Sequence, residues 1–455
     1  MLNSVLRFGA LSMLLGLLWG AAAAETLSLR QAAEAALNLN PELAASQARI
    51  AQSEAGLKQA DGAHLPRVNV SLNATHSNDA LTAFGLKLGQ ERIAAADFNP
   101  ATLNNPSAIS NFNTRVEVTA PLYSGGQIGA RQDEARAQVR AAREGDAAAR
   151  QQVLLDVLQA YQGAHLASAY VQVSEQAKTA AAEVVRVTGS LHKQGMAVKS
   201  DLLSARVNLE NAKLRVSEAR RQEATALDRL KMLMGRKLGD DIEVGSEFGN
   251  TSFANTSQPK LPVGDAEALR AQAIAQHPAL KALRSQVEAA GFTLDAARGA
   301  KKPQLNAMAR HDWNDRGLGF GAASYTLGGT LSWNVFDGGH NDAGIDRAQA
   351  ARLEQAAKLR QAEEGIAFQV TDAYRRALEA EERLAARDDA VTEAEEAQRL
   401  TRLRYENGVT TLVDLLSTQT QLDRARADLA QARYDLSVSR GQVLQAAGSL
   451  DTEQL

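Results

Sequence analysis

The chain contains the same plan twice, and this duplication constrains its fold more than any other feature. Pro41 and Pro66 in the first half correspond to Pro278 and Pro303 in the second half, each 237 residues later (278 − 41 and 303 − 66). Each pair of prolines bounds an Ala-rich, charged run with helical spacing. The sequence therefore predicts two copies of one structural unit.

Two glycine positions repeat further along the chain. Gly125 corresponds to Gly338, and Gly195 corresponds to Gly408, in both cases 213 residues later (338 − 125 and 408 − 195). The offset falls by 24 residues, so the first copy carries 24 extra residues between its second proline and its first glycine. We predict that this excess, which includes Phe84 to Pro106, forms an extracellular loop.

The first residues have the composition of an export signal. A basic residue, an apolar stretch from 11 to 19 and small residues at 21 to 24 are typical of a secretory signal peptide. We predict a signal peptide at 1–24, a first repeat at 25–238, a connector at 239–262 and a second repeat at 263–455. The connector is rich in Gly, Asn, Ser and Thr, and we expect it to lie outside the long helices.

Composition argues against several classes of function. The chain has no cysteine, which excludes disulfides, thiolate metal sites and a lipid-acylated cysteine, and its net charge of −3 gives no electrostatic case for nucleic acid. Its seven histidines stand apart without a metal-ligand spacing. We therefore expect no enzyme activity and no cofactor.

Four short segments alternate between apolar and polar residues, at 66–75, 112–122, 304–313 and 325–335. This alternation predicts strands with one apolar and one wet face. Such strands fit a small soluble sheet packed on helices or part of a membrane β-barrel, and the barrel is favoured because the chain offers no obvious apolar slab to cover the sheet. Single-chain membrane barrels start at about eight strands, so four strands would have to be pooled between subunits.

Aromatic residues gather near these strands. A membrane barrel carries aromatic girdles at both interfaces with water. We predict that the girdle includes Phe112, Tyr123, Trp313 and Trp333.

The remaining sequence predicts very long helices. Residues 128–194 and 343–407 contain no proline, and second helices are predicted to run to about 234 and 447. Helices of this length require a coiled coil rather than a globular core. Gly195 and Gly408 would form the turns of two helical hairpins, with Ser200 and either Thr410 or Thr411 capping the helices that follow.

These features together resemble the TolC-type outer-membrane efflux proteins. The resemblance rests on the Asn-Pro-Glu-Leu and His-Pro-Ala-Leu openings, the Pro-Leu-Tyr-Ser-Gly-Gly and Asn-Val-Phe-Asp-Gly-Gly junctions, and the Tyr-Glu-Asn-Gly tip. It implies a homotrimer with a 12-stranded barrel and a long α-helical, coiled-coil periplasmic tunnel. It also implies a passive exit duct that meets a periplasmic adaptor and an inner-membrane transporter.

The resemblance places the entrance of the tunnel at the tips of the helical hairpins. It implies that Asp414 forms part of a ring of carboxylates, while Ser417 stands where the family has a second acid. Asp201 and Tyr405 match residues that link neighbouring hairpins, and Thr410 replaces a basic residue of that network. A plainer interpretation is that a carboxylate in the first turn of a helix stabilises that turn.

The resemblance also implies that Gly195 and Gly408 lie on the surface that an adaptor meets. Two other functions remain open from the sequence, a periplasmic adaptor and a coiled-coil scaffold without a channel. The sequence does not distinguish drugs, other small molecules or proteins as the cargo.

Overall fold

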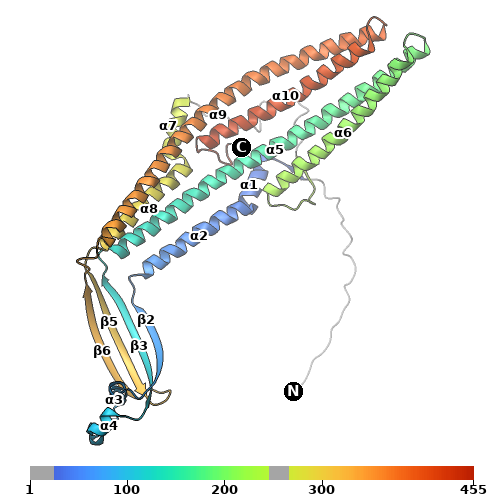
Figure 1. Ribbon diagram of the computed structural model, residues 1–455. Coiled ribbons are helices and arrows are strands. Elements are labelled where there is room, and N and C mark those ends of the chain that lie inside the picture. The colour runs from blue at the N-terminus through green and yellow to red at the C-terminus, as the bar shows by residue number, and fades with distance from the viewer. Residues whose placement is uncertain (1–24, 245–265) are drawn as a thin grey trace, which may run out of the picture.

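The computed structural model describes residues 25–244 and 266–455 as an elongated molecule with a β-sheet at one end and two long helical hairpins at the other (Figure 1). The predicted signal peptide at 1–24 and most of the predicted connector at 239–262 lie outside the described residues.

The first proline of each pair marks the start of a helix. α1 (Leu29–Leu39) is followed by α2 (Pro41–Gly62), and α7 (Ala266–Gln276) is followed by α8 (Pro278–Gly299). Proline is tolerated at the first helical position because its missing N–H has no intrahelical acceptor there. The preceding residue caps each helix: the Asn40 side chain accepts from the Glu42 N–H, and that of His277 accepts from the Ala279 N–H.

The long helices match the predicted runs closely. The first hairpin is α5 (Gln127–Lys193) and α6 (Lys199–Leu233), and the second is α9 (His340–Glu406) and α10 (Leu412–Ala446). The shorter α1, α2 and α6 pack along α5, α7 packs along α9, and α8 and α10 pack along both long helices. The two long helices are therefore flanked by shorter ones stacked end to end.

The largest core lies at mid-length of α5. Its apolar residues from Val153 to Tyr161 are buried against α1, the end of α6 and the C-terminal segment, and the Tyr161 hydroxyl donates to the Leu27 carbonyl at 3.0 Å. Two short parallel strands, β1 (Glu25–Leu27) and β4 (Ile242–Val244), lie beside it. The start and the end of the first repeat therefore lie next to each other at this core.

The four longer strands form one antiparallel sheet in the order β2-β3-β5-β6. They are β2 (Arg67–Ser77), β3 (Ile109–Tyr123), β5 (Gln304–Asp315) and β6 (Ala322–Ser332). The last strand ends earlier than predicted, since Trp333 and Val335 follow it.

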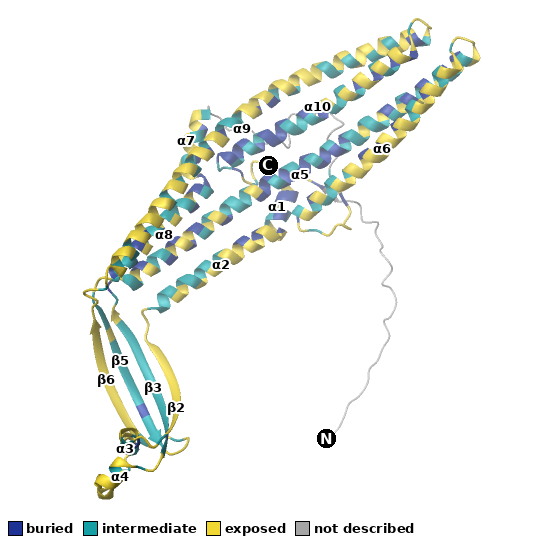
Figure 2. Ribbon diagram, in the orientation of Figure 1, coloured by how far each residue is buried: buried dark blue, intermediate teal, exposed yellow. Residues whose placement is uncertain are grey.

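The register places most apolar positions of the four strands on one face. Val70, Val116, His311 and Tyr325 lie in one row across the strands, and the next row, Ser71, Arg115, Asp312 and Ser324, belongs to the opposite face. The side chains of Val70 and Leu327 are 71% and 73% exposed, so the apolar face is uncovered in the isolated chain. β2 and β6 are exposed along their length (Figure 2).

The connection that carries the excess, residues 78–108, is more regular than the predicted loop. It contains α3 (Ala80–Gly89), a 3₁₀ turn η1 (Ala95–Phe98) and the short helix α4 (Pro100–Asn104), at the end of the sheet far from the hairpins (Figure 1). Asp79 starts α3 by accepting from the Thr82 N–H at 2.8 Å. Side-chain caps of this kind are the local signals that turn a polar loop into helices.

Within residues 25–244 and 266–455, no helix combines the length and the apolar character needed to cross a membrane.

Candidate functional site

The two hairpin turns are closed by glycine in the same way. Gly195 and Gly408 have φ angles of 76° and 71°, a left-handed conformation that side chains with a Cβ rarely adopt. The residues that follow them donate backbone hydrogen bonds to the Leu191 and Arg404 carbonyls at 2.9 and 2.8 Å. Each turn is therefore a Schellman motif, which satisfies the last carbonyls of the preceding helix.

Asp414 lies in the first turn of α10 and forms a capping box with Thr411. The Thr411 side chain accepts from the Asp414 N–H, while Asp414 Oδ2 accepts from the Thr411 N–H, the Thr411 hydroxyl and the Thr410 hydroxyl at 3.2, 2.7 and 2.8 Å. These bonds, from Thr411 first and then Thr410, hold the pKa of Asp414 below its usual value. The carboxylate is therefore charged and turned toward its own helix end.

The other predicted entrance residues lie around this turn. Ser417 is exposed one turn further along α10. Asp201 lies in the first turn of α6, where its carboxylate makes no hydrogen bond or ion pair within the described ranges of the chain. Ser200 was wrongly predicted as the cap of α6, because that helix begins at Lys199 and Val198 occupies the cap position without a side-chain bond.

Tyr405 connects the two hairpins. Its hydroxyl lies 2.9 Å from the hydroxyl of Thr188 on α5, and the two residues are 5% and 0% exposed. Tyr405 packs in a small apolar cluster near the tip that also contains Val184, Leu412 and Leu415. A buried hydroxyl pair within an apolar cluster is a contact that water cannot easily replace.

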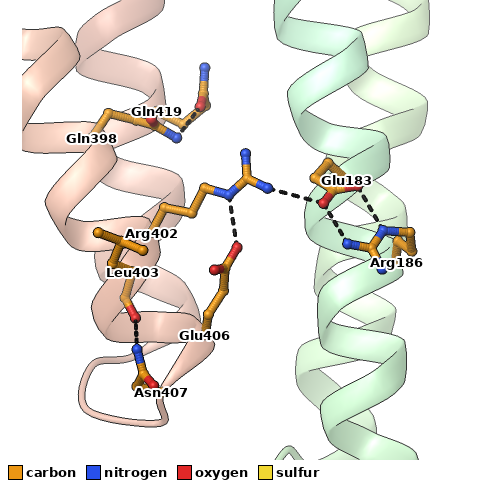
Figure 3. A network of polar contacts seen from close by, with 8 residues as sticks. All are labelled: Glu183, Arg186, Gln398, Arg402, Leu403, Glu406, Asn407 and Gln419. Carbon is orange, nitrogen blue, oxygen red and sulfur yellow. Dashed lines mark hydrogen bonds and ion pairs between the residues drawn. The ribbon is translucent and has the colours of Figure 1, made fainter.

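An ion-pair chain joins the same two helices near the tip (Figure 3). Arg402 on α9 pairs with Glu183 on α5 at 3.0 Å and with Glu406 one turn later at 2.9 Å. Glu183 also accepts from Arg186, which together with Arg402 holds the pKa of Glu183 below its usual value. The second hairpin is thus joined to the first by a charged contact and a buried neutral contact.

Polar contacts within and between the hairpins continue away from the tip. Gln398 donates to Gln419 at 2.9 Å across the second hairpin, and Gln419 donates to Asp423, whose pKa is raised by burial. Polar pairs that join the first hairpin to the second include, in order from the tip, Thr188–Tyr405, Glu183–Arg402, Gln176–Arg426 and Tyr170–Gln431.

Sequence reasoning found Tyr405 but missed Thr188, Glu183 and Arg402. The charged residues fall at spacings of three and four with Arg186 and Glu406, which is the pattern of ordinary pairs on a helix surface. Glu183 and Arg402 meet only because α5 and α9 are positioned so that these two residues lie at the same level along the molecule.

The polar face of the sheet forms a second cluster. The Arg115 side chain pairs with Asp312 at 2.7 Å, and Asn113 donates to the same carboxylate at 3.2 Å. These groups come from the central strands β3 and β5, where a cross-strand register places them opposite each other. The charged groups stabilise one another on the face opposite the apolar one.

The predicted girdle residues lie toward the two ends of the sheet. Phe112 and Trp313 are near the end that carries α3, and Trp313 stacks edge-on against Phe320 at 5.5 Å. Tyr123 ends β3 at the side of the helices, and Trp333 follows β6 there, with its indole N–H donating to the Lys301 carbonyl at 3.0 Å. Their role in a membrane girdle stays a prediction.

In the part of the chain that the structure describes, no group of three or more acidic or histidine side chains is arranged to hold a metal ion.

Comparison with known sequences identifies the family. The family model described as outer membrane efflux protein matches residues 32–236 and 269–449. The alkaline protease secretion protein AprF of Pseudomonas aeruginosa is 25% identical over 67% of this chain, and the match spans 63% of the length of that relative. The outer membrane efflux protein BepC of Brucella suis is 23% identical over 75% of this chain and 73% of its own length.

Solved structures show the same fold. The CmeC outer membrane channel of Campylobacter jejuni aligns over 99% of this chain and 96% of its own with a TM-score of 0.79 at 17% identity. The outer membrane protein VceC of Vibrio cholerae aligns over 92% and 96% with a TM-score of 0.76 at 17% identity. With a family model matched in both halves and this fold, the chain belongs to the outer membrane efflux protein family and is an outer-membrane protein.

Proposed function

We propose that three copies of this chain form a passive exit duct across the outer membrane. The observation that carries the proposal is the sheet, which has one apolar face, one polar face and two unpaired edges at β2 and β6. Each unpaired backbone group in lipid would cost several kcal/mol, so these edges need partners. A neighbouring copy supplies them if its β2 pairs with β6 of the first.

The number of copies follows from the width that a duct needs. Two copies would supply eight strands, and the interior of an eight-stranded barrel is just wide enough for side chains to fill. Three copies supply twelve strands (3 × 4) and leave room for solutes. The polar face with Arg115 and Asp312 would then line the lumen, and the aromatic residues at the sheet ends would lie at the two interfaces with water.

The helices would continue this lumen into the periplasm as a tunnel whose entrance is at the hairpin turns. Three copies of Asp414 would surround one axis there, and a ring of carboxylates favours cations. Tyr405 and Arg402 would hold the two hairpins of each copy together, and the Gly195 and Gly408 turns would meet a periplasmic adaptor. The duct itself performs no chemistry, and energy comes from an inner-membrane transporter.

Two classes of cargo fit this proposal. AprF is named for secretion of a protease, and BepC is named for efflux. Both would use the same passive lumen, so the cargo of this chain is a protein or a small molecule delivered by its partner. Family membership favours the duct over the adaptor and the scaffold considered from the sequence.

The test is the conductance of the purified protein in a planar bilayer, compared with Asp414→Ala. A cation-selective channel whose selectivity falls in the variant supports the duct and the carboxylate ring. Ser417→Ala is the matched control, since it changes an exposed uncharged residue one turn away. Absence of any channel from folded, inserted protein would contradict the proposal. If the Asp414→Ala channel has the same selectivity as the wild type, Asp414 only stabilises the first turn of α10.

A further inference from the structure

Residues 78–108, the connection from β2 to β3, fold back onto the end of the sheet. Gln90, at the C-terminal end of α3, donates its Nε2 hydrogens to the Ser110 carbonyl at 2.8 Å and to Asn111 Oδ1 at 2.9 Å. Gln90 and Asn111 are 6% and 3% exposed. A connection anchored by buried side chains in this way does not project freely beyond the sheet.

The anchor lies on the polar face. Asn111 shares its face with Asn113 and Arg115, because alternate residues of a strand point the same way. It also donates to Asn314 of β5 at 2.9 Å, and Gly89 lies so close to Asn314 that an added Cβ would be 3.8 Å from that side chain. The end of α3 therefore covers the polar face of β3 and β5.

The connection has an internal structure that holds it in this position. Lys87 pairs with Asp97, and the rings of Phe84 and Phe98 meet edge to face at 5.9 Å. Arg92 donates to Gln90 Oε1 at 2.7 Å and so orients the anchoring amide.

The backbone beside the anchor is strained. Glu91 has a φ of 55° and is, among the described residues, the non-glycine residue with a positive φ. Its conformation allows the Arg92 N–H to donate to the Lys87 carbonyl at 3.1 Å and turns the chain at the end of α3. A side chain in this conformation persists where the surrounding contacts determine it.

We propose that residues 78–108 form a constriction at the outer mouth of the duct. This inference rests on the proposed function, because it requires the polar face to line the lumen. Three copies of the connection would then fold inward over the exit and limit the size of what passes. The corresponding connection in the second half, residues 316–321, is much shorter, so the constriction belongs to the first repeat.

The absence of cysteine in the chain makes thiol labelling a direct test. Thr326 lies opposite Arg310 on the polar face, and Leu327 lies opposite Ala309 on the apolar face. Thr326→Cys and Leu327→Cys would be labelled in whole cells from outside, with a small and a bulky membrane-impermeant thiol reagent. Because the reagent enters from outside, the hairpin tips do not affect the result.

Each cysteine is combined with three changes in the connection. In the first, residues 78–108 are replaced by the Arg316–Gly321 segment. In the second, Gln90→Ala removes the anchor. In the third, the control Glu91→Gly keeps the turn with a residue that adopts it without strain.

With the natural connection, we expect Thr326→Cys to react with the small reagent and only slowly with the bulky one. The shortened connection should raise the bulky reagent's rate toward that of the small reagent, because the selectivity of a pore depends on its diameter. Gln90→Ala should act in the same direction, and Glu91→Gly should change nothing. If the shortened chain does not fold, the Gln90→Ala variant still tests the proposal.

Equal rates for the bulky reagent with and without the anchor would overturn the constriction while leaving the duct in place. Labelling of Leu327→Cys in preference to Thr326→Cys would instead show that the polar face is not the lumen. That result would overturn the proposed function together with this inference.

Discussion

The contact between Tyr405 and Thr188 gives the sharpest prediction about the entrance. Tyr405→Phe keeps the ring in its apolar cluster and removes only the hydroxyl that lies 2.9 Å from the Thr188 hydroxyl. The buried Thr188 hydroxyl then loses its partner as long as the hairpins stay together. When the hairpins separate, water reaches that hydroxyl, so the substitution penalises only the arrangement in which the two hairpins are in contact.

The size of the penalty follows from burial. Leaving a buried hydroxyl unpaired costs about 1 to 3 kcal/mol. A threonine hydroxyl in a helix can rotate toward the carbonyl one turn earlier, which places the expected cost near the lower end of that range. A shift of about 1 to 3 kcal/mol changes the ratio of separated to closed hairpins by about 5- to 150-fold in each subunit.

The assay is single-channel recording in a planar bilayer. We expect the Tyr405→Phe channel to spend more time at high conductance than the wild type. Adding Thr188→Val should return it toward the wild type, because an apolar pair of similar shape leaves no unpaired group. Tyr434→Phe, on half-buried Tyr434 of α10, is the control and should have no effect.

Two results would refute this reasoning. A folded Tyr405→Phe channel that is indistinguishable from the wild type would mean that the hydroxyl pair does not hold the hairpins. A double variant as open as the single variant would mean that the opening has a cause other than the unpaired hydroxyl.

Three further predictions concern charge. Arg402→Ala should open the channel less than Tyr405→Phe, and its effect should shrink at high salt because the ion pair with Glu183 is partly exposed; a salt-independent effect would contradict this. Val70→Arg should reduce assembly in the outer membrane, because an arginine that faces lipid near mid-membrane costs about 2 to 4 kcal/mol. Ser71→Arg, on the polar face, should assemble normally. Assembly would be measured by heat-modifiable mobility on gels, and equal assembly of the two variants would mean that the faces are misassigned. Burial lowers the pKa of His165 to about 4 from 6.5, so the unfolded chain binds a proton between these values that the folded chain does not. Stability should therefore fall by about 3 kcal/mol as the pH falls through this window, and His165→Gln should lose this dependence in thermal unfolding.

The sequence predicted the helices well because their signals are local. Prolines at the first helical positions and glycines in left-handed turns act within one turn of the chain, so the ends of α5 and α9 fall within a few residues of the predicted positions. The strand β6 was predicted three residues too late in the chain, because apolar alternation continues to Val335 after the pairing with β5 has ended.

The contacts at the candidate site were less accessible to sequence reasoning. Glu183 and Arg402 are 219 positions apart, and their pairing depends on how two long helices are set side by side. The fold of residues 78–108 was also missed, because its anchor Gln90 is an ordinary polar residue until β3 and β5 bring Asn111 and Asn314 beside it. Long-range packing, which single-residue patterns do not encode, decides both.

The most direct test of the account is the number of chains that share one barrel. Untagged copies of the chain and copies made longer by a tag would be produced together in the same cells. The oligomers would be extracted from the outer membrane without unfolding and separated by size. Pooling of four strands from each of three copies predicts two pure and two mixed oligomers. A single species that contains one chain, or one mixed species between the pure ones, would contradict the shared twelve-stranded barrel.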